Sequence, residues 1–107
     1  MVLSKRVEDS IILSIYNTKK INFLKINALK NQIVNSLKSS CKKIFIDLEG
    51  IHFIDSQSFD CLRFANDLAL LNDSELYFIN VSEDLKELFS LIDKDHVLKL
   101  QEVNVMA

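Results

Sequence analysis

Two places in this chain of 107 residues carry side chains whose types and spacing could do chemistry. Asp55 and Ser56 follow the apolar run "IHFI" and stand where a helical pattern begins. Asp47 and Glu49 lie two residues apart in "IFIDLE", so they share one face of a predicted strand. A serine beside a carboxylate at a helix start suits helix capping or phosphorylation, and paired carboxylates suit acid–base catalysis.

The carboxylate pair is a weak candidate for catalysis. No nucleophile, histidine or phosphate-binding loop accompanies it in the sequence, and general acid–base chemistry needs such partners within hydrogen-bond reach. Cys41 and Cys61 lack the CxxC spacing of metal and redox sites, so we expect buried or half-buried thiols without chemistry. The sequence therefore predicts no enzymatic activity, no metal and no cofactor.

Ser56 is a stronger candidate, with two interpretations. Serine is among the commonest residues at helix N-caps, and a capping serine needs no chemistry. A phosphate at the same place would meet free N–H groups and the positive end of the helix dipole, so a phosphorylated domain should stay folded. Asp55 could orient the hydroxyl for a kinase or serve the loop backbone.

The elements that position these residues alternate between strands and helices. Residues 7 to 16 predict one or two strands, and "ELYFINV" and "HVLKL" predict two more. "KIFIDLE" predicts an interior strand with Ile44, Ile46 and Leu48 on one face. Helical patterns cover residues 25 to 37, 56 to 71 and 82 to 92, the last capped by Ser82. This order indicates an α/β fold, a mixed sheet of four or five strands covered by helices.

The helix predicted over residues 56 to 71 carries a broad apolar arc. The arc comprises Cys61, Leu62, Phe64, Ala65, Leu68 and Ala69. Phe59 falls with Asp60 and Arg63 on the other side, one turn from Ser56. It is either an exposed anchor for a partner or a residue that the first turn tilts into the sheet or under the preceding loop. By their pattern, five other phenylalanines are expected in the core: Phe45, Phe53, Phe64, Phe78 and Phe89.

Composition limits the remaining classes of function. Apolar residues make up 49% of the chain and charged residues 26%, which is typical of one globular domain, here spanning residues 1–107. The net charge is −2 and lysine and arginine are scattered, so nucleic acid is not an expected partner. No apolar run approaches the length of a membrane span, and the N-terminus shows no signal peptide, so we expect a cytoplasmic protein without membrane insertion.

The stretch "IFIDLEGIHFIDSQSF" resembles the central signature of the STAS domain, the anti-sigma-factor antagonist family. That signature has an apolar strand, Asp-Leu, a short spacer, an aromatic and an apolar residue, then Asp-Ser-x-Gly and an aliphatic residue. The matching residues are Asp47, Leu48, Phe53, Ile54, Asp55, Ser56 and Phe59. The order of elements on both sides also fits, so the resemblance covers most of the chain and implies a STAS-like fold.

The resemblance implies a partner-switching module. In this family a serine after the motif's Asp is phosphorylated by a kinase that is also the anti-sigma factor, and a phosphatase reverses the step; that serine corresponds to Ser56. Ser58 replaces the family's glycine, would fill space that a partner backbone could approach, and is a reserve phosphoacceptor. The expected partner-binding residues are Asp55, Gln57, Ser58, Phe59 and Arg63. The alternative is a STAS subunit of a larger complex or ABC-type transporter that works without phosphorylation.

Overall fold

A mixed five-stranded sheet forms the centre of the computed structural model, which describes residues 2–95 and 97–101. The strands are β1 (Val2–Val7), β2 (Ser10–Ile15), β4 (Lys43–Asp47), β6 (Glu75–Ile79) and β7 (Lys99–Leu100), in the order β1-β2-β4-β6-β7. β1 is antiparallel to β2, and all other pairs in this sheet are parallel. Two short strands, β3 (Lys20–Ile21) and β5 (Phe53–Ile54), form a separate parallel pair.

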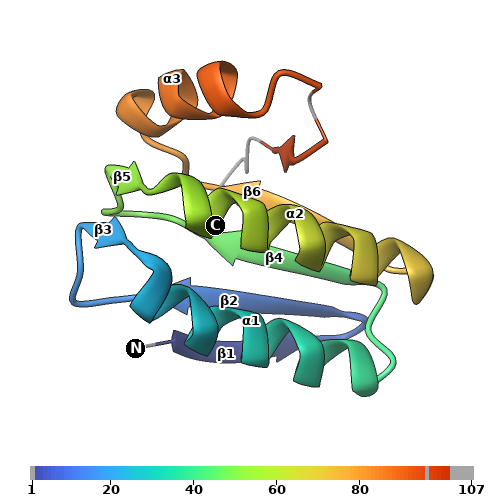
Figure 1. Cartoon of the computed structure of the whole chain (residues 1–107). Coiled ribbons are helices and arrows are strands. Elements are labelled where there is room, and N and C mark those ends of the chain that lie inside the picture. The colour runs from blue at the N-terminus through green and yellow to red at the C-terminus, as the bar shows by residue number, and fades with distance from the viewer. Residues whose placement is uncertain (1, 96, 102–107) are drawn as a thin grey trace.

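Three helices pack on one face of the sheet: α1 (Phe23–Lys38), α2 (Ser56–Leu71) and α3 (Glu83–Ile92). α1 and α2 lie side by side over the sheet, with their axes roughly along the strands, and α3 lies beyond α2 (Figure 1). The stripe predicted for α1 is confirmed, because Ile26, Leu29 and Ile33 are buried. α2 begins and ends where the sequence predicts, and Ser82 caps α3 by accepting a hydrogen bond from the Leu85 N–H.

β4 is an interior strand, as predicted. It pairs with β2 on one side and β6 on the other, and the side chains of Ile44, Ile46 and Leu48 are fully buried beneath the helices. The predicted count of four or five strands is confirmed for the main sheet. The last strand is shorter than "HVLKL", since β7 contains only Lys99 and Leu100; residue 96 lies outside the described residues.

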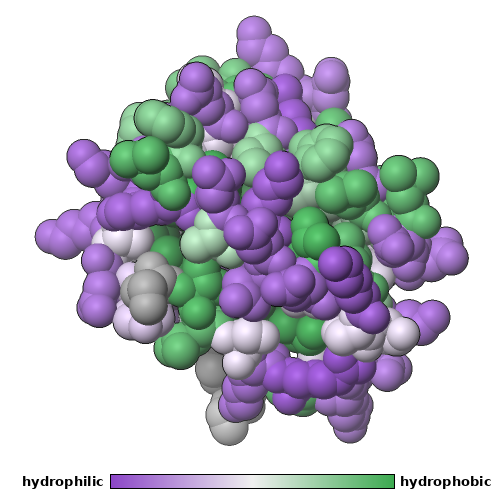
Figure 2. Space-filling model, turned by 60° about the horizontal axis from the view of Figure 1, so that its bottom comes forward, coloured by the Kyte–Doolittle hydropathy of each residue, from purple (hydrophilic) through white to green (hydrophobic). Residues whose placement is uncertain are grey.

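The opposite face of the sheet carries half-buried side chains. Ile12, Phe45, Tyr77 and Lys99 occupy neighbouring strands in register, the rings of Phe45 and Tyr77 stack at 5.5 Å, and Lys99 Nζ lies over the Tyr77 ring. On the side that lies at the bottom of Figure 1, hydrophobic residues form separate groups between hydrophilic ones (Figure 2). That side therefore lacks the continuous apolar surface of an obligate interface.

Two of the five core predictions for phenylalanine are wrong, and of the two alternatives for Phe59 the exposed anchor is wrong. Phe59 is fully buried, and its ring meets that of Phe89 edge to face with 4.9 Å between centroids, so it cannot be an exposed anchor. Phe64 is 51% exposed beneath Lys30 of α1, and Phe53 is also exposed. Phe59 is buried because α3 covers the side of α2 that carries it. Phe78 and Phe89 are buried as predicted, and Phe45 is half-buried.

The two aromatics on α2 give a matched test of this packing. Phe59→Ala should destabilise the domain by about 3–5 kcal/mol, because a large side chain is removed from a closed core. Phe64→Ala should cost less than about 1 kcal/mol, because that ring is half exposed. Urea denaturation of both variants measures the difference. Equal losses would contradict the placement of Phe59 beneath α3.

Candidate functional site

The pair of short strands brings two helix N-termini together. β3 leads into α1 and β5 leads into α2, and because Ile21 pairs with Ile54 in parallel register, the two helices begin side by side (Figure 1). Asn22 caps α1, its side chain accepting from the N–H groups of Leu24 and Lys25. The positive ends of two helix dipoles therefore converge on this edge of the molecule.

The carboxylate of Asp55 joins the two helix ends. Its Oδ1 accepts a hydrogen bond from the Ser58 N–H of α2 at 2.8 Å, and its Oδ2 accepts one from the Phe23 N–H of α1 at 3.2 Å. The Asp55 N–H in turn donates to the Ile21 carbonyl. Asp55 is thus the N-cap of α2 and also satisfies a free N–H of α1.

Hydrogen bonding and the neighbouring hydroxyl favour the ionised form of Asp55. The Ser58 side chain lowers the pKa of this carboxyl most, burial raises it by less than that, and the N–H groups of Ser58 and Phe23 each lower it further. The Ser58 hydroxyl has no hydrogen-bond partner in the structure, whereas the Ser58 N–H donates at 2.8 Å. Of the groups that lower the pKa, only the two N–H groups form hydrogen bonds to Asp55 in the structure.

Ser56 is the first residue of α2 and its side chain is exposed. It is not the N-cap, so the capping interpretation of Ser56 is wrong: a residue one position earlier already holds the free N–H groups. Among the described residues, no side-chain hydrogen bond of Ser56 occurs. Its hydroxyl is consequently available for modification without the loss of a structural contact.

Ser58 does not fit its predicted roles. Its side chain is fully buried inside the first turn of α2, so a kinase cannot reach the hydroxyl and the residue occupies internal space instead of a surface near a partner. The hydroxyl is also one of the buried polar groups without a hydrogen bond in the described structure. The reserve phosphoacceptor is therefore ruled out for the folded domain, and Gln57, which is exposed, is the neighbour that a partner could contact.

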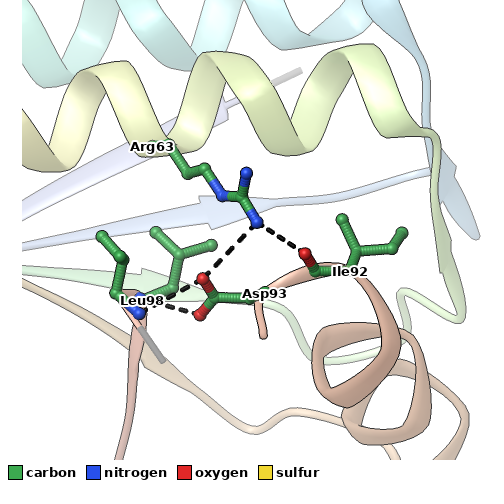
Figure 3. A network of polar contacts seen from close by, with 5 residues as sticks. Arg63, Ile92, Asp93 and Leu98 are labelled. Atoms are coloured by element: carbon green, nitrogen blue, oxygen red, sulfur yellow. Dashed lines mark hydrogen bonds and ion pairs between the residues drawn. The ribbon is translucent and has the colours of Figure 1, made fainter. Parts of the chain in front are cut away.

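Arg63 is engaged inside the domain. Its Nη2 donates to the Ile92 carbonyl at the end of α3 and lies 3.7 Å from Oδ1 of Asp93 (Figure 3). The buried Asp93 carboxylate also accepts from the N–H groups of Val97 and Leu98. Arg63 thus connects α2 to the end of α3 and the segment before β7, which makes it a structural residue in place of the predicted partner contact.

The exposed apolar residues near Ser56 are ones that sequence analysis missed. Phe23 and Leu24 lie in the first turn of α1, and Phe53 lies in β5 directly before the site; all three are exposed. Leu24 lies off the buried stripe of α1, which was an available signal. Phe23 lies three residues before Ile26, on the stripe, so periodicity favours its burial. We call Phe23, Leu24, Phe53 and Gln57 the rim of Ser56.

Two kinds of feature, a metal centre and a membrane-spanning helix, are absent from the described part of the chain. Within it, no group of three or more His, Cys, Asp or Glu side chains could hold a metal ion. None of the helices formed by residues 2–95 and 97–101 is long and apolar enough to cross a membrane. Cys41 is buried and Cys61 half-buried, and burial raises the pKa of both thiols, which disfavours the reactive thiolate.

The bridging carboxylate predicts a defined pH dependence. Because the pKa of Asp55 is lower in the folded state than in the unfolded chain, its contribution to stability is complete above about pH 4 and is lost as the pH falls through the folded-state pKa. Asp55→Ala should cost about 1–2 kcal/mol at pH 7, the usual loss for an N-cap, and should weaken the acid dependence. Urea denaturation between pH 3 and pH 7 measures both, and an unchanged profile would refute the bridge.

Both a protein-family model and solved structures of other proteins match this chain. A family model described as the STAS domain matches residues 3–104. The phosphorylated form of SpoIIAA from Bacillus superposes with a TM-score of 0.71 at 8% identity, covering 98% of this chain and 93% of that one. A putative anti-sigma-factor antagonist from Thermotoga maritima has a TM-score of 0.78 at 21% identity, covering 97% and 87%.

A variant of RsbS from Moorella thermoacetica has a TM-score of 0.76 at 14% identity and covers 95% of this chain and 86% of that one. A search of curated protein sequences found no match. At these identities the structural likeness shows a shared fold, and the family model matches nearly the whole chain. The chain therefore belongs to the STAS domain family.

Proposed function

We propose that this STAS domain is an anti-sigma-factor antagonist that works as a partner switch. It binds a serine kinase that is also an anti-sigma factor through the rim of Ser56, phosphorylation of Ser56 releases that partner, and a phosphatase restores binding. The domain acts by binding alone, without catalysis or a cofactor. Its fold supports the proposal, since SpoIIAA, described as an anti-sigma factor antagonist, has the same fold in its phosphorylated and unphosphorylated forms.

One observation carries the proposal: the capping role and the exposed hydroxyl belong to different residues. Asp55 makes the hydrogen bonds that hold the two helix ends, and Ser56 beside it is exposed. A phosphate on Ser56 would lie at a helix N-terminus, where N–H groups and the helix dipole favour negative charge. The modification can therefore change the surface while the fold persists.

The rim explains how that change would act on a partner. Phe23, Leu24 and Phe53 present apolar surface at the start of α1 and in β5, the elements that adjoin the start of α2, which suits a partner that excludes water from the contact. A phosphate brings about −1.5 to −2 charges, and together with Asp55 gives a patch of roughly −3. Burying that charge against apolar or acidic partner groups is costly, so binding is lost without unfolding.

Substitution of Ser56 tests the switch directly. Ser56→Asp should leave the melting temperature nearly unchanged and lower partner affinity by about tenfold or more, with a smaller loss at high salt. Ser56→Ala should keep both partner affinity and, because Ser56 is not the cap, stability within about 0.5 kcal/mol of the wild type. Calorimetric titration with a partner isolated by pull-down measures affinity.

Phosphosite mapping by mass spectrometry after incubation with that partner and ATP completes the test. Phosphate should appear on Ser56 and not on the buried Ser58. An unmodified Ser56, together with equal partner affinity for wild type and Ser56→Asp, would leave a constitutive subunit of a larger assembly as the better account.

Two exposed leucines test the rim with matched exposure. Leu24 in the first turn of α1 is 70% exposed, and Leu91 near the end of α3 is 68% exposed. Leu24→Ser should weaken partner binding by about 1–3 kcal/mol, because an interface contact is lost, whereas Leu91→Ser should have no effect on binding. Both variants should unfold at nearly the wild-type temperature. Equal binding by the two variants would place the interface elsewhere.

A further inference from the structure

A hollow of about 770 Å³ lies at the carboxyl ends of β2 and β4, and Ser56 is not among the residues that line it. It is lined by the ends of these strands, by the loop of residues 16–19 that leads to β3, and by Glu49 and Gly50 of the loop that leads to β5. Its volume is in the range of small-molecule sites. The carboxyl ends of parallel strands are also where open α/β sheets commonly bind their ligands.

The hollow is preformed, because backbone contacts hold both loops. The His52 N–H donates to the Lys19 carbonyl at 2.7 Å, which ties one loop to the other. Asp47 Oδ1 accepts from the Glu49 N–H and from the Asn80 side chain, each at 3.0 Å. Gly50, the chain's only glycine, has a φ of +82°, a conformation that other residues rarely adopt and that this turn requires. A ligand would therefore meet a shape already ordered.

Unpaired polar side chains converge on this hollow. Among the described residues, the side chains of Ser14, Tyr16, Lys19 and Glu49 form no hydrogen bond or ion pair, although all four line it. Ser14 and Asp47 are cross-strand neighbours in register, so their side chains stand on the same face. The lining thus combines one ammonium, two carboxylates, three hydroxyls, one amide and an aromatic ring.

We propose that this hollow binds a free amino acid as a zwitterion. The ligand's ammonium would be held by the carboxylates of Asp47 and Glu49, its carboxylate by Lys19 Nζ, and its side chain against the ring of Tyr16. A simple amine would leave Lys19 without a partner, and a simple acid would face two carboxylates, so charges of both signs on one small molecule suit the lining best. Neither Ser56 nor any residue of its rim lines this site.

The test is to titrate the isolated domain with each of the standard amino acids in free form. Binding is measured by calorimetry and by ¹H–¹⁵N NMR. We expect saturable binding by at least one amino acid below about 10 mM, with shifts at residues 14–19 and 47–50. For the tightest ligand, the matched amine lacking the carboxylate and the matched acid lacking the ammonium should each bind about tenfold more weakly or worse. For phenylalanine, these analogues are 2-phenylethylamine and 3-phenylpropionate.

Variants of the two exposed charged residues complete the design. Glu49→Gln and Lys19→Met should each weaken binding about tenfold, since each removes a charge-assisted hydrogen bond, and neither should change folding because both side chains are unpaired in the described structure. Glu87→Gln and Lys38→Met, exposed on other elements, are the matched controls and should bind as the wild type does. No saturable binding by any amino acid, equal binding of an analogue lacking one charge, or binding insensitive to both site variants would each overturn the proposal.

Discussion

The contact on which the site depends is the carboxylate of Asp55 between two helix N-termini. One oxygen accepts from the Ser58 N–H of α2 and the other from the Phe23 N–H of α1. Both N–H groups would otherwise lack partners, since the first turn of a helix has no carbonyl to bond them. Because β3 and β5 pair in parallel directly before these helices, a single side chain can serve both. The relative position of the two helix starts, and so of the surface around Ser56, follows from this arrangement.

That arrangement places the structural contacts and an exposed hydroxyl at two adjacent positions. Asp55 carries the hydrogen bonds, and Ser56 presents an exposed hydroxyl one residue later. The rest of α2 is fixed independently: Phe59 is enclosed by Phe89 of α3, and Arg63 reaches the end of that helix. A charge added at Ser56 therefore acts at the end of a rigid element. Such a surface can change its binding properties without a conformational change, which is what a switch by phosphorylation requires.

The fold was predictable from sequence because its signals are local. The alternation of Ile44, Ile46 and Leu48 identifies an interior strand, and the bounds of α2 follow from an apolar run, a capping pair and a helical period. The position of Phe59 was predicted wrongly because a helical wheel describes one helix alone. It does not include α3, which is about thirty residues away in the chain and covers that side of α2. The buried face of α2 is rotated from the arc that hydrophobicity alone suggests, and it comprises Ser58, Phe59, Leu62, Ala65, Asn66 and Ala69.

The site was predictable only in part, for the same reason. The Asp55-Ser56 pair was recognised at the right place, but the cap was assigned to the wrong member, because both residue types cap helices equally well. The hydrogen bond from Phe23 joins residues 32 positions apart and has no sequence signal. The exposure of the rim was equally hard to predict from sequence. Phe53 has the pattern of a core strand, yet β5 is too short and too near the surface to bury it.

The central claim is that a phosphate at Ser56 changes the surface and leaves the scaffold intact. Its most direct test is the ¹H–¹⁵N NMR spectrum of the domain carrying phosphoserine introduced at position 56 during synthesis, compared with the unmodified domain. The account predicts shifts confined to the N-terminal turns of α1 and α2 and to β3 and β5, with the signals of β2, β4 and β6 unchanged. Shifts spread across the central strands, or loss of signal dispersion, would show that the modification disturbs the fold and would contradict the account.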